Sequence, residues 1–276
     1  MRCRPTVTPF TDPSLPNRDL LPLIYCYRPE AEGVAGPLDA PYEPIGIMAA
    51  LDGVVELLLH YTVVQEAVIL DRLTFYRGLI NNRQVVLVRC GVGKVNAALC
   101  AAILIKQFSA RSVILVGMAG ALFSRLKRGD IVVSEDLIQH DLDATRLGHP
   151  PGVLPGLGIR AIAADESMIL LALKCSSALL GVKAYRGRVL TGDQFISSKI
   201  SFLRTLFNGL CVEMEGGAVA QVCALTGIPF VVIRAISQRS NGKFMRKYNT
   251  FSQMVAGNLA LLLREMLNNT TNIPSA

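Results

Sequence analysis

Short apolar runs alternate with stretches of helical periodicity along most of the chain, from Ile45 to Leu267. The runs are of strand length, and several are followed by a turn and then by a segment rich in alanine and leucine. Such alternation is typical of a largely parallel sheet that helices cover on both faces. We therefore predict one α/β domain at residues 45–268, with a central mixed, largely parallel sheet wrapped by helices.

The turn residues between these runs set the expected elements. Asn81 and Asn82 join two strands as a hairpin, and Asp165 is placed to cap a helix. Strands are predicted at residues 45–50, 63–70, 74–80, 84–90, 112–117, 130–134, 185–190 and 229–237, and helices at 54–60, 94–106, 165–180, 216–226 and 249–267. Ligands of such sheets sit beyond the carboxyl ends of the strands. The segments expected around one crevice are residues 90–91, 117–120, 191–196 and 237–238.

The two ends of the chain differ from this domain. Residues 1–44 carry nine of the fourteen prolines and few periodic apolar positions. We expect a disordered or loosely packed extension there, and a non-functional leader or a misassigned start codon explains it at least as well as a functional role does. Residues 269–276 are expected to form a short tail.

The composition limits the class of protein. Hydrophobic residues make up 51% of the chain and charged residues 18%, which favours elements buried on both faces and an oligomer that hides further apolar surface. The apolar stretch at 113–123 is broken by glycines and falls short of the roughly 18 to 20 residues of a membrane-spanning helix. No export signal is evident either. We expect a cytoplasmic protein without a membrane span.

Cysteine, histidine and basic residues exclude further classes. None of the seven cysteines forms a C-x-x-C pair, and the three histidines lack metal-ligand spacing. We infer a reducing compartment, no metal and no cofactor. The formal net charge of +7 could attract anionic ligands, but no basic motif with interleaved aromatic residues accompanies it. We therefore expect no nucleic-acid partner.

Three motifs carry possible chemistry. The segment Gly91–Lys94 resembles a phosphate loop without its full spacing, and a tight strand-to-helix turn explains its glycines equally well. The small residues at 117–121 could admit a flat ligand to the backbone or could serve close packing. Glu213 and Glu215 flank Met214 where an apolar strand meets a helix. A buried acid needs a partner, and a pair of sugar hydroxyls is one, so either glutamate is a candidate.

Together these motifs and others resemble one family. The ordered segments are residues 46–50, 91–95, 117–120, 128–134, 140–143, 192–196, 212–215 and 231–237. They look like the methylthioadenosine/S-adenosylhomocysteine nucleosidases of the nucleoside phosphorylase superfamily, over nearly all of residues 45–268. The resemblance implies a homodimer that cleaves the N-glycosidic bond of an adenine nucleoside, such as methylthioadenosine or S-adenosylhomocysteine, with water.

The resemblance also implies roles for individual residues. Phe195 and Ile196 would flank the adenine, with Ile196 offering backbone hydrogen bonds. Met214 would lie against the ribose, and Glu215 would accept its two hydroxyls. Arg234 would orient groups beside the ribose, and Phe251 would close the pocket near the 5′-substituent. The expected substrate-binding positions are Gly120, Phe195, Ile196, Met214, Glu215, Arg234 and Phe251.

The positions for proton transfer depart from the family pattern. Hydrolysis passes through a ribosyl cation, so an acid must assist the leaving base and a carboxylate must activate the water. The family's acid position holds Gln238, which can donate a hydrogen bond but cannot deliver a proton. The base position holds Val54, and Met118 replaces a common serine near the water. Asp52 or Glu56 could replace the base only if the turn is shifted.

Three hypotheses follow. The residues favour a protein that binds an adenine nucleoside but has impaired or lost catalysis. The alternative is an active nucleosidase that releases adenine with altered acid and base groups. Phosphorolysis ranks lowest, because Met48 and Ala49 in the first loop offer no anion site.

Overall fold

One mixed sheet forms the centre of the structure, a computed structural model that describes residues 43–269 apart from 51, 71 and 240–247. The predictions for residues 1–42 and 270–276 therefore lie outside the described residues. The strands are β1 (Ile45–Ala49), β2 (Val63–Leu70), β3 (Leu73–Ile80), β4 (Arg83–Arg89), β5 (Ser112–Ala121), β6 (Ile131–Gln139), β7 (Ile162–Ala163), β8 (Ala184–Thr191), β9 (Cys211–Glu213) and β10 (Phe230–Arg239). The helices are α1 (Asp52–Leu59), α2 (Lys94–Lys106), η1 (Thr145–Leu147), α3 (Glu166–Ser176), α4 (Ile200–Phe207), α5 (Gly216–Thr226) and α6 (Tyr248–Asn268).

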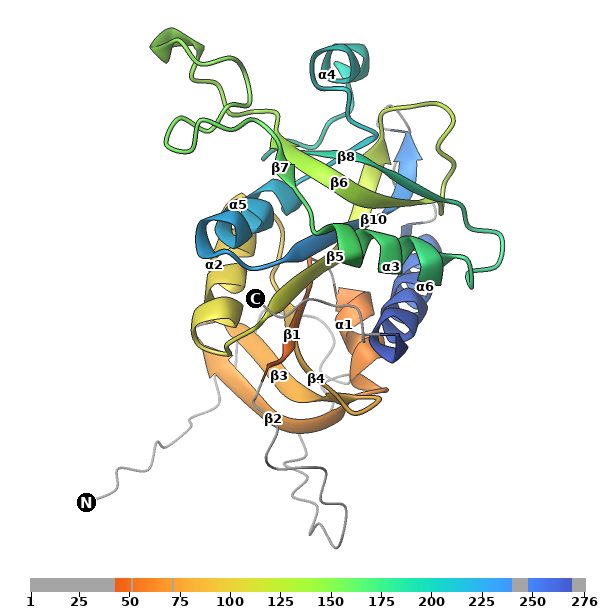
Figure 1. Cartoon of the computed structure of the whole chain (residues 1–276). Coiled ribbons are helices and arrows are strands. Elements are labelled where there is room, and N and C mark those ends of the chain that lie inside the picture. Colours follow the sequence, from red (N-terminus) through yellow and green to blue (C-terminus); the bar gives the residue numbers. More distant parts are fainter. Residues whose placement is uncertain (1–42, 51, 71, 240–247, 270–276) are drawn as a thin grey trace, which may run out of the picture. The chain divides into compact units, whose positions relative to one another are not determined.

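Five strands of this sheet close into a ring. The hydrogen-bonded order is β10-β6-β8-β9-β5-β1-β4-β3-β2, and β10 also pairs with β5. The pairs β5–β10, β6–β8 and β8–β9 are parallel, whereas β6–β10 and β5–β9 are antiparallel. The ring brings together strand ends that lie far apart in the sequence (Figure 1). All strands that carry the candidate site, described below, belong to it.

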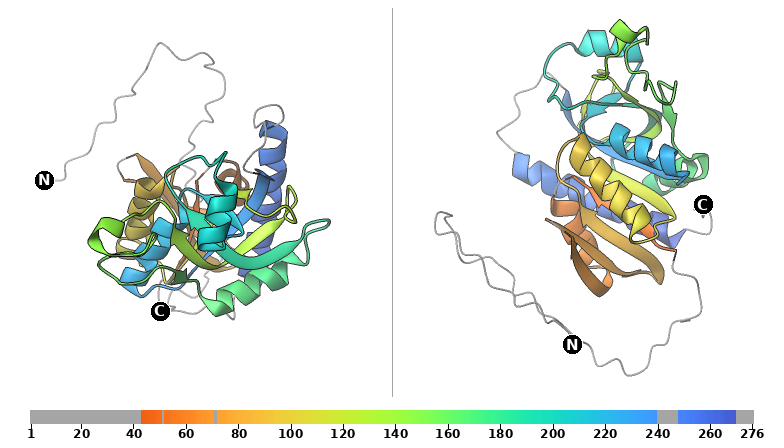
Figure 2. Two further views of the ribbon diagram at one scale, coloured as in Figure 1. Left: turned by 90° about the horizontal axis from the view of Figure 1, so that it is seen from above. Right: turned by 90° about the vertical axis from the view of Figure 1, so that its left-hand side faces the viewer.

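Helices cover both faces of the sheet, as the alternation of elements predicts. Side chains alternate between two core clusters along the buried strands: Leu115 packs with α2 and α5, and its neighbours Ile114 and Val116 pack with α1, α3 and α6. Helices α2 and α5 lie side by side on one face (Figure 2, right). The predicted fold class, a mixed sheet wrapped by helices, is confirmed.

Most predicted elements are present with shifted ends. The hairpin turn is confirmed, with φ of 50° at Asn81 and 61° at Asn82, as a two-residue turn between twisted strands requires. The strand predicted at 112–117 continues to Ala121, because β9 and β10 pair with its last residues. The helix predicted through residue 180 ends at Ser176, where the hydroxyls of Ser176 and Ser177 donate to carbonyls three residues earlier.

Within the described part of the chain, none of the helices combines the length and the apolar character that a membrane crossing requires.

Candidate nucleoside site

Two glutamates and an arginine meet where β9 runs into α5. Glu213 ends β9, Glu215 is the N-cap residue of α5, and Arg234 lies in β10. Their residues are buried, with exposures of 5%, 4% and 0%. The Arg234 Nη2 group donates to Glu213 Oε2 and, at 3.3 Å, to Glu215 Oε2. A buried guanidinium is thus compensated by two carboxylates, which leaves the cluster with one net negative charge.

The hydrogen bonds of Glu213 assign it a positioning role. Its Oε2 atom accepts from the backbone N–H groups of Glu215 at 3.0 Å and Gly216 at 2.8 Å, in addition to Arg234. Its Oε1 atom accepts from the Thr191 hydroxyl, which itself accepts from Gly217 N at 2.7 Å. Four protein donors therefore engage this carboxylate, three on Oε2 and one on Oε1. Of the two candidate glutamates, Glu213 is thus the one held mainly by the protein itself.

Glu215 has more unused acceptor capacity than Glu213, because two protein donors engage it instead of four. Its Oε1 atom accepts from Gly93 N at 2.9 Å and its Oε2 atom accepts from Arg234. Burial raises the pKa of the Glu215 carboxyl; Arg234 opposes that shift and the charge of Glu213 adds to it. An acceptor of this kind gains from hydroxyl donors that replace its lost hydration. Glu215 is therefore the glutamate suited to binding sugar hydroxyls.

Arg234 explains one of the small residues at the end of β5. Gly117 is the register partner of Arg234, and a Cβ atom on Gly117 would come within 2.1 Å of Arg234 Nη1. Glycine is thus required for close packing of the guanidinium, one of the two interpretations of this motif. Among the described residues, the buried Nε and Nη1 atoms of Arg234 have no hydrogen-bond partner. Such donors are costly unless a water or a ligand oxygen satisfies them.

The glycine-rich turn before α2 points two backbone N–H groups at carboxylates. Gly91 and Gly93 have φ of 79° and 98°, which only glycine adopts readily, so the tight-turn interpretation explains both. Gly93 N donates to Glu215, and Lys94 N donates to Asp193 Oδ1 at 3.0 Å. The helix N-terminus, where a phosphate could bind, thus holds two protein carboxylates.

The structure places the other predicted binding residues as follows. Met214 is half-buried between the two glutamates, and Gly120 pairs with Val212 of β9 next to them. Phe195 is 64% exposed in the segment after β8, and Ile196 is half-buried there. Phe251 is buried at the start of α6, with the Arg128 guanidinium 3.7 Å from its ring centroid. Their contacts with a ligand stay predictions.

The predicted base position, Val54, is apolar in the structure. Val54 is 7% exposed and packs in the same core cluster as Phe251, and Met118 packs against that cluster. Glu56 is exposed, so it does not take the place of Val54. Gln238 lies within β10 and pairs with Gly120, but its side chain, like that of Asp52, falls outside the described residues.

Sequence reasoning missed the supporting hydrogen bonds. The role of Thr191 in holding Glu213 and the donation from Gly93 to Glu215 join residues that are far apart in the chain. The only sequence signal was that Thr191 directly precedes the Gly192-Asp193 motif and that Gly93 lies in the glycine-rich turn.

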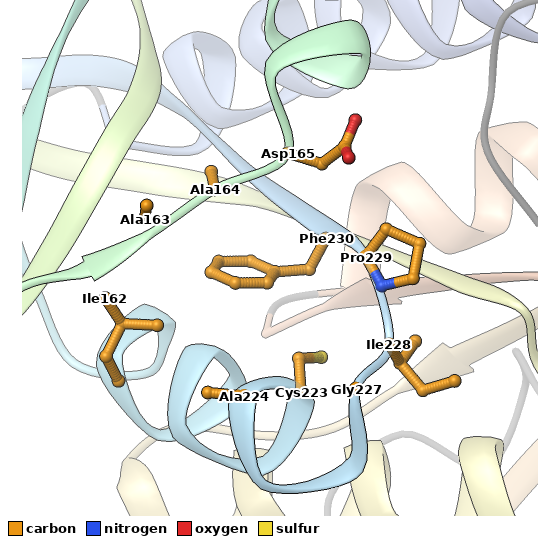
Figure 3. A pocket seen from close by; sticks show the side chains of 10 residues that line it. All are labelled: Ile162, Ala163, Ala164, Asp165, Cys223, Ala224, Gly227, Ile228, Pro229 and Phe230. Carbon is orange, nitrogen blue, oxygen red and sulfur yellow. The ribbon is translucent and has the colours of Figure 1, made fainter. Parts of the chain in front are cut away.

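A separate pocket lies at the other end of β10 (Figure 3). Its volume is about 400 Å³, and residues of β7, the end of α5 and the start of β10 line it, Cys223 and Phe230 among them. None of the predicted binding residues contributes to it. Among the described residues, no three His, Cys, Asp or Glu side chains gather as metal ligands would.

Comparison with known proteins shows the family to which this fold belongs. Residues 44–268 match the family model of the phosphorylase superfamily. The 5′-methylthioadenosine/S-adenosylhomocysteine nucleosidase of Anoxybacillus flavithermus is 35% identical over 227 residues, which cover 81% of this chain and 97% of that protein. The chain therefore belongs to the 5′-methylthioadenosine/S-adenosylhomocysteine nucleosidase family of the phosphorylase superfamily, as the motifs predicted.

Solved structures agree with this assignment. The nucleosidase of Colwellia psychrerythraea 34H in complex with adenine is 32% identical, with a TM-score of 0.79 over 85% of this chain and 98% of that one. The futalosine hydrolase of Helicobacter pylori is 30% identical, with a TM-score of 0.77 over 83% of this chain and 98% of that one. The fold is thus shared by proteins with different named substrates.

Proposed function

We propose that the protein binds an adenine nucleoside of the methylthioadenosine or S-adenosylhomocysteine type and that its hydrolytic activity is impaired or lost. The observation that carries the binding half is the state of Glu215, a buried carboxylate with unused acceptor capacity beside Arg234. Two adjacent sugar hydroxyls match that capacity, because each can donate one hydrogen bond.

The residue types at the two predicted proton-transfer positions support the catalytic half of the proposal. Val54 occupies the base position within an apolar cluster and cannot activate water. Gln238 at the acid position cannot deliver a proton to the leaving adenine. General acid and general base groups each contribute roughly a hundred- to ten-thousand-fold in rate, although effects within one site do not simply multiply.

The alternative is an active nucleosidase. It is favoured by the complete Glu213–Glu215–Arg234 cluster, since a protein without selection on its site has no need to retain three buried charges. Phosphorolysis remains the weakest hypothesis. The helix N-terminus in which phosphate could bind is occupied by Glu215 and Asp193, whose negative charge repels an anion.

Calorimetric titration of the full chain with methylthioadenosine and with S-adenosylhomocysteine tests the proposal, with chromatography of the same samples to detect free adenine. Saturable binding without adenine is the expected result. Adenine release that disappears in the Glu215→Gln variant would establish the alternative, and absence of binding by folded protein would refute both.

We also propose a homodimer. Helix α2 is apolar on most of its circumference, yet Val92, Val95 and Leu99 on and just before it are 49%, 80% and 47% exposed. A helix that is apolar all round is normally buried, so a second copy that covers this face fits the pattern.

We also propose a cytoplasmic location. It is supported by five described cysteines that are buried and unpaired, which is usual in a reducing compartment.

A further inference from the structure

A closed network of three charged residues lies beside the candidate site. Lys94 begins α2, Asp141 follows β6, and Asp193 follows β8. The Lys94 Nζ atom donates to Asp141 Oδ1 at 2.9 Å and lies 3.7 Å from Asp193 Oδ2. Lys94 N donates to Asp193 Oδ1 at 3.0 Å, and Asp193 N donates to Asp141 Oδ2 at 2.8 Å. Each residue thus contacts both of the others.

The network is partly shielded from water. The side chains of Lys94 and Asp141 are 20% and 18% exposed, whereas that of Asp193 is 50% exposed. Charge-assisted hydrogen bonds in such surroundings are stronger than those of open surface pairs. The pKa of Asp141 lies below its usual range, because the hydrogen bonds from Lys94 and Asp193 outweigh the effect of burial. Both Asp141 oxygens are therefore held as acceptors.

The position of the network links two halves of the predicted site. Lys94 follows Gly93, whose backbone N–H group holds Glu215, the predicted acceptor for the ribose hydroxyls. Asp193 precedes Phe195 and Ile196, the predicted adenine neighbours, by two and three residues. The consecutive N–H groups of Gly93 and Lys94 thus hold Glu215, the predicted acceptor for the ribose hydroxyls, and Asp193, which begins the segment predicted to contact adenine.

We propose that Lys94, Asp141 and Asp193 act as positioning residues that hold the segment 193–196 at a fixed place relative to Glu215 and so set the affinity for the adenine base. The inference rests on the proposed nucleoside binding. An ordered segment costs less entropy to bind than one that must be immobilised by the ligand. Asp141 is the critical member, because it accepts hydrogen bonds on both oxygens and asparagine offers only one acceptor oxygen.

Titration of the full chain with free adenine and with methylthioadenosine separates positioning from general damage. Asp141→Asn and Lys94→Met are the test variants. We expect each variant to lower the affinity for adenine and the affinity for methylthioadenosine by the same factor, roughly ten- to hundred-fold. This is the range for the loss of a charge-assisted hydrogen bond. Glu166→Gln is the matched control, since Glu166 forms a bidentate pair with Arg186 outside the site. It should leave both affinities unchanged.

The outcomes distinguish this inference from the proposed function. Unchanged adenine affinity in both folded variants would overturn the inference alone. A larger loss for methylthioadenosine than for adenine, together with a lowered melting temperature, would overturn it too, because the network would then support the whole fold. A wild-type chain that binds neither compound would refute the proposed function before any variant is compared.

Discussion

The backbone N–H group of Gly93 donates a 2.9 Å hydrogen bond to Glu215 Oε1 across 122 positions of the chain. The donor stands at the N-terminus of α2, where the partial positive charge of the helix favours a carboxylate. Arg234 supplies the second fixed donor. Glu215 is thus held in place before any ligand arrives, and the acceptor sites that remain are oriented in advance.

Glu215→Gln should weaken methylthioadenosine binding by about a hundred-fold, because the variant replaces a charged acceptor of two hydroxyls by an amide with a single acceptor oxygen. Affinity for free adenine, which has no sugar, should stay unchanged. Calorimetry with both compounds measures this difference. Glu56→Gln is the control, since Glu56 is exposed on α1. Equal losses for adenine and methylthioadenosine would argue against a role of Glu215 in ribose binding.

Binding of methylthioadenosine should strengthen as the pH rises from 4.5 through the raised pKa of Glu215, because the ionised carboxylate accepts both hydroxyls. The same shift has the opposite effect on folding. Below pH 4.5 the Glu215 carboxyl is protonated in both the native and the unfolded protein. As the pH rises above 4.5, the unfolded protein loses this proton before the native protein does, so the contribution of Glu215 to the free energy of unfolding falls. Titrations and melting curves of wild type and Glu215→Gln at several pH values check both signs.

Gly117→Ala should destabilise the protein by about 1–3 kcal/mol, because the new methyl group overlaps Arg234 Nη1. Gly257→Ala in α6 is the matched control. Among the described residues, and apart from the backbone of α6 and the two chain neighbours, no atom lies within 4 Å of a Cβ at that position, so the variant should be neutral or more stable by up to about 1 kcal/mol. Denaturant unfolding of both variants gives the comparison. Equal stability of Gly117→Ala and wild type would mean that Arg234 has another position available.

The sequence allowed the fold class and most elements to be predicted, since periodicity and turn residues are local signals. Helix α4 was not predicted, although Ile200, Leu203 and Phe207 have helical spacing, because the helix is short and follows an irregular segment. The ring of five strands could not be derived from local patterns. The β5–β9 and β6–β10 pairs join strands separated by long stretches of chain.

The candidate site, too, could be predicted from the sequence only in part. Ordered motifs identified Glu213 and Glu215 as candidates, but only the contacts of Thr191 and of the α5 N-terminus show that the protein engages Glu213 more fully than Glu215. Gly117 likewise needed the position of Arg234 for its explanation. Such roles depend on contacts between elements, which a single sequence does not contain.

Val95→Glu should convert the proposed dimer to a monomer, because it places a charge on an apolar surface that a second copy would cover. Light scattering after size-exclusion chromatography measures the mass. Leu180→Glu is the control, because Leu180 is 99% exposed outside α2 and its substitution should leave the mass unchanged. A wild-type chain that elutes as a monomer at all concentrations would contradict the proposal.

The double variant Val54→Glu, Gln238→Asp should release adenine from methylthioadenosine at least about a hundred-fold faster than wild type, because it restores a base and an acid at the positions that lack them. Val54 is 7% exposed, so the new carboxylate has a desolvation cost, and a melting curve must show that the variant is folded. Each single variant should recover less than the double variant. A folded double variant no faster than wild type would mean that these two positions do not limit the reaction.

A single-turnover measurement of adenine release shows directly whether the protein hydrolyses the nucleoside that it binds. The wild-type chain, in excess over methylthioadenosine and at a concentration at which calorimetry shows the nucleoside to be bound, is followed by chromatography for many hours. We predict a bound nucleoside that stays intact, with adenine appearing no faster than in buffer. If wild type forms adenine faster than buffer does, and Glu215→Gln does not, the protein is an active nucleosidase and the proposed loss of hydrolysis is wrong.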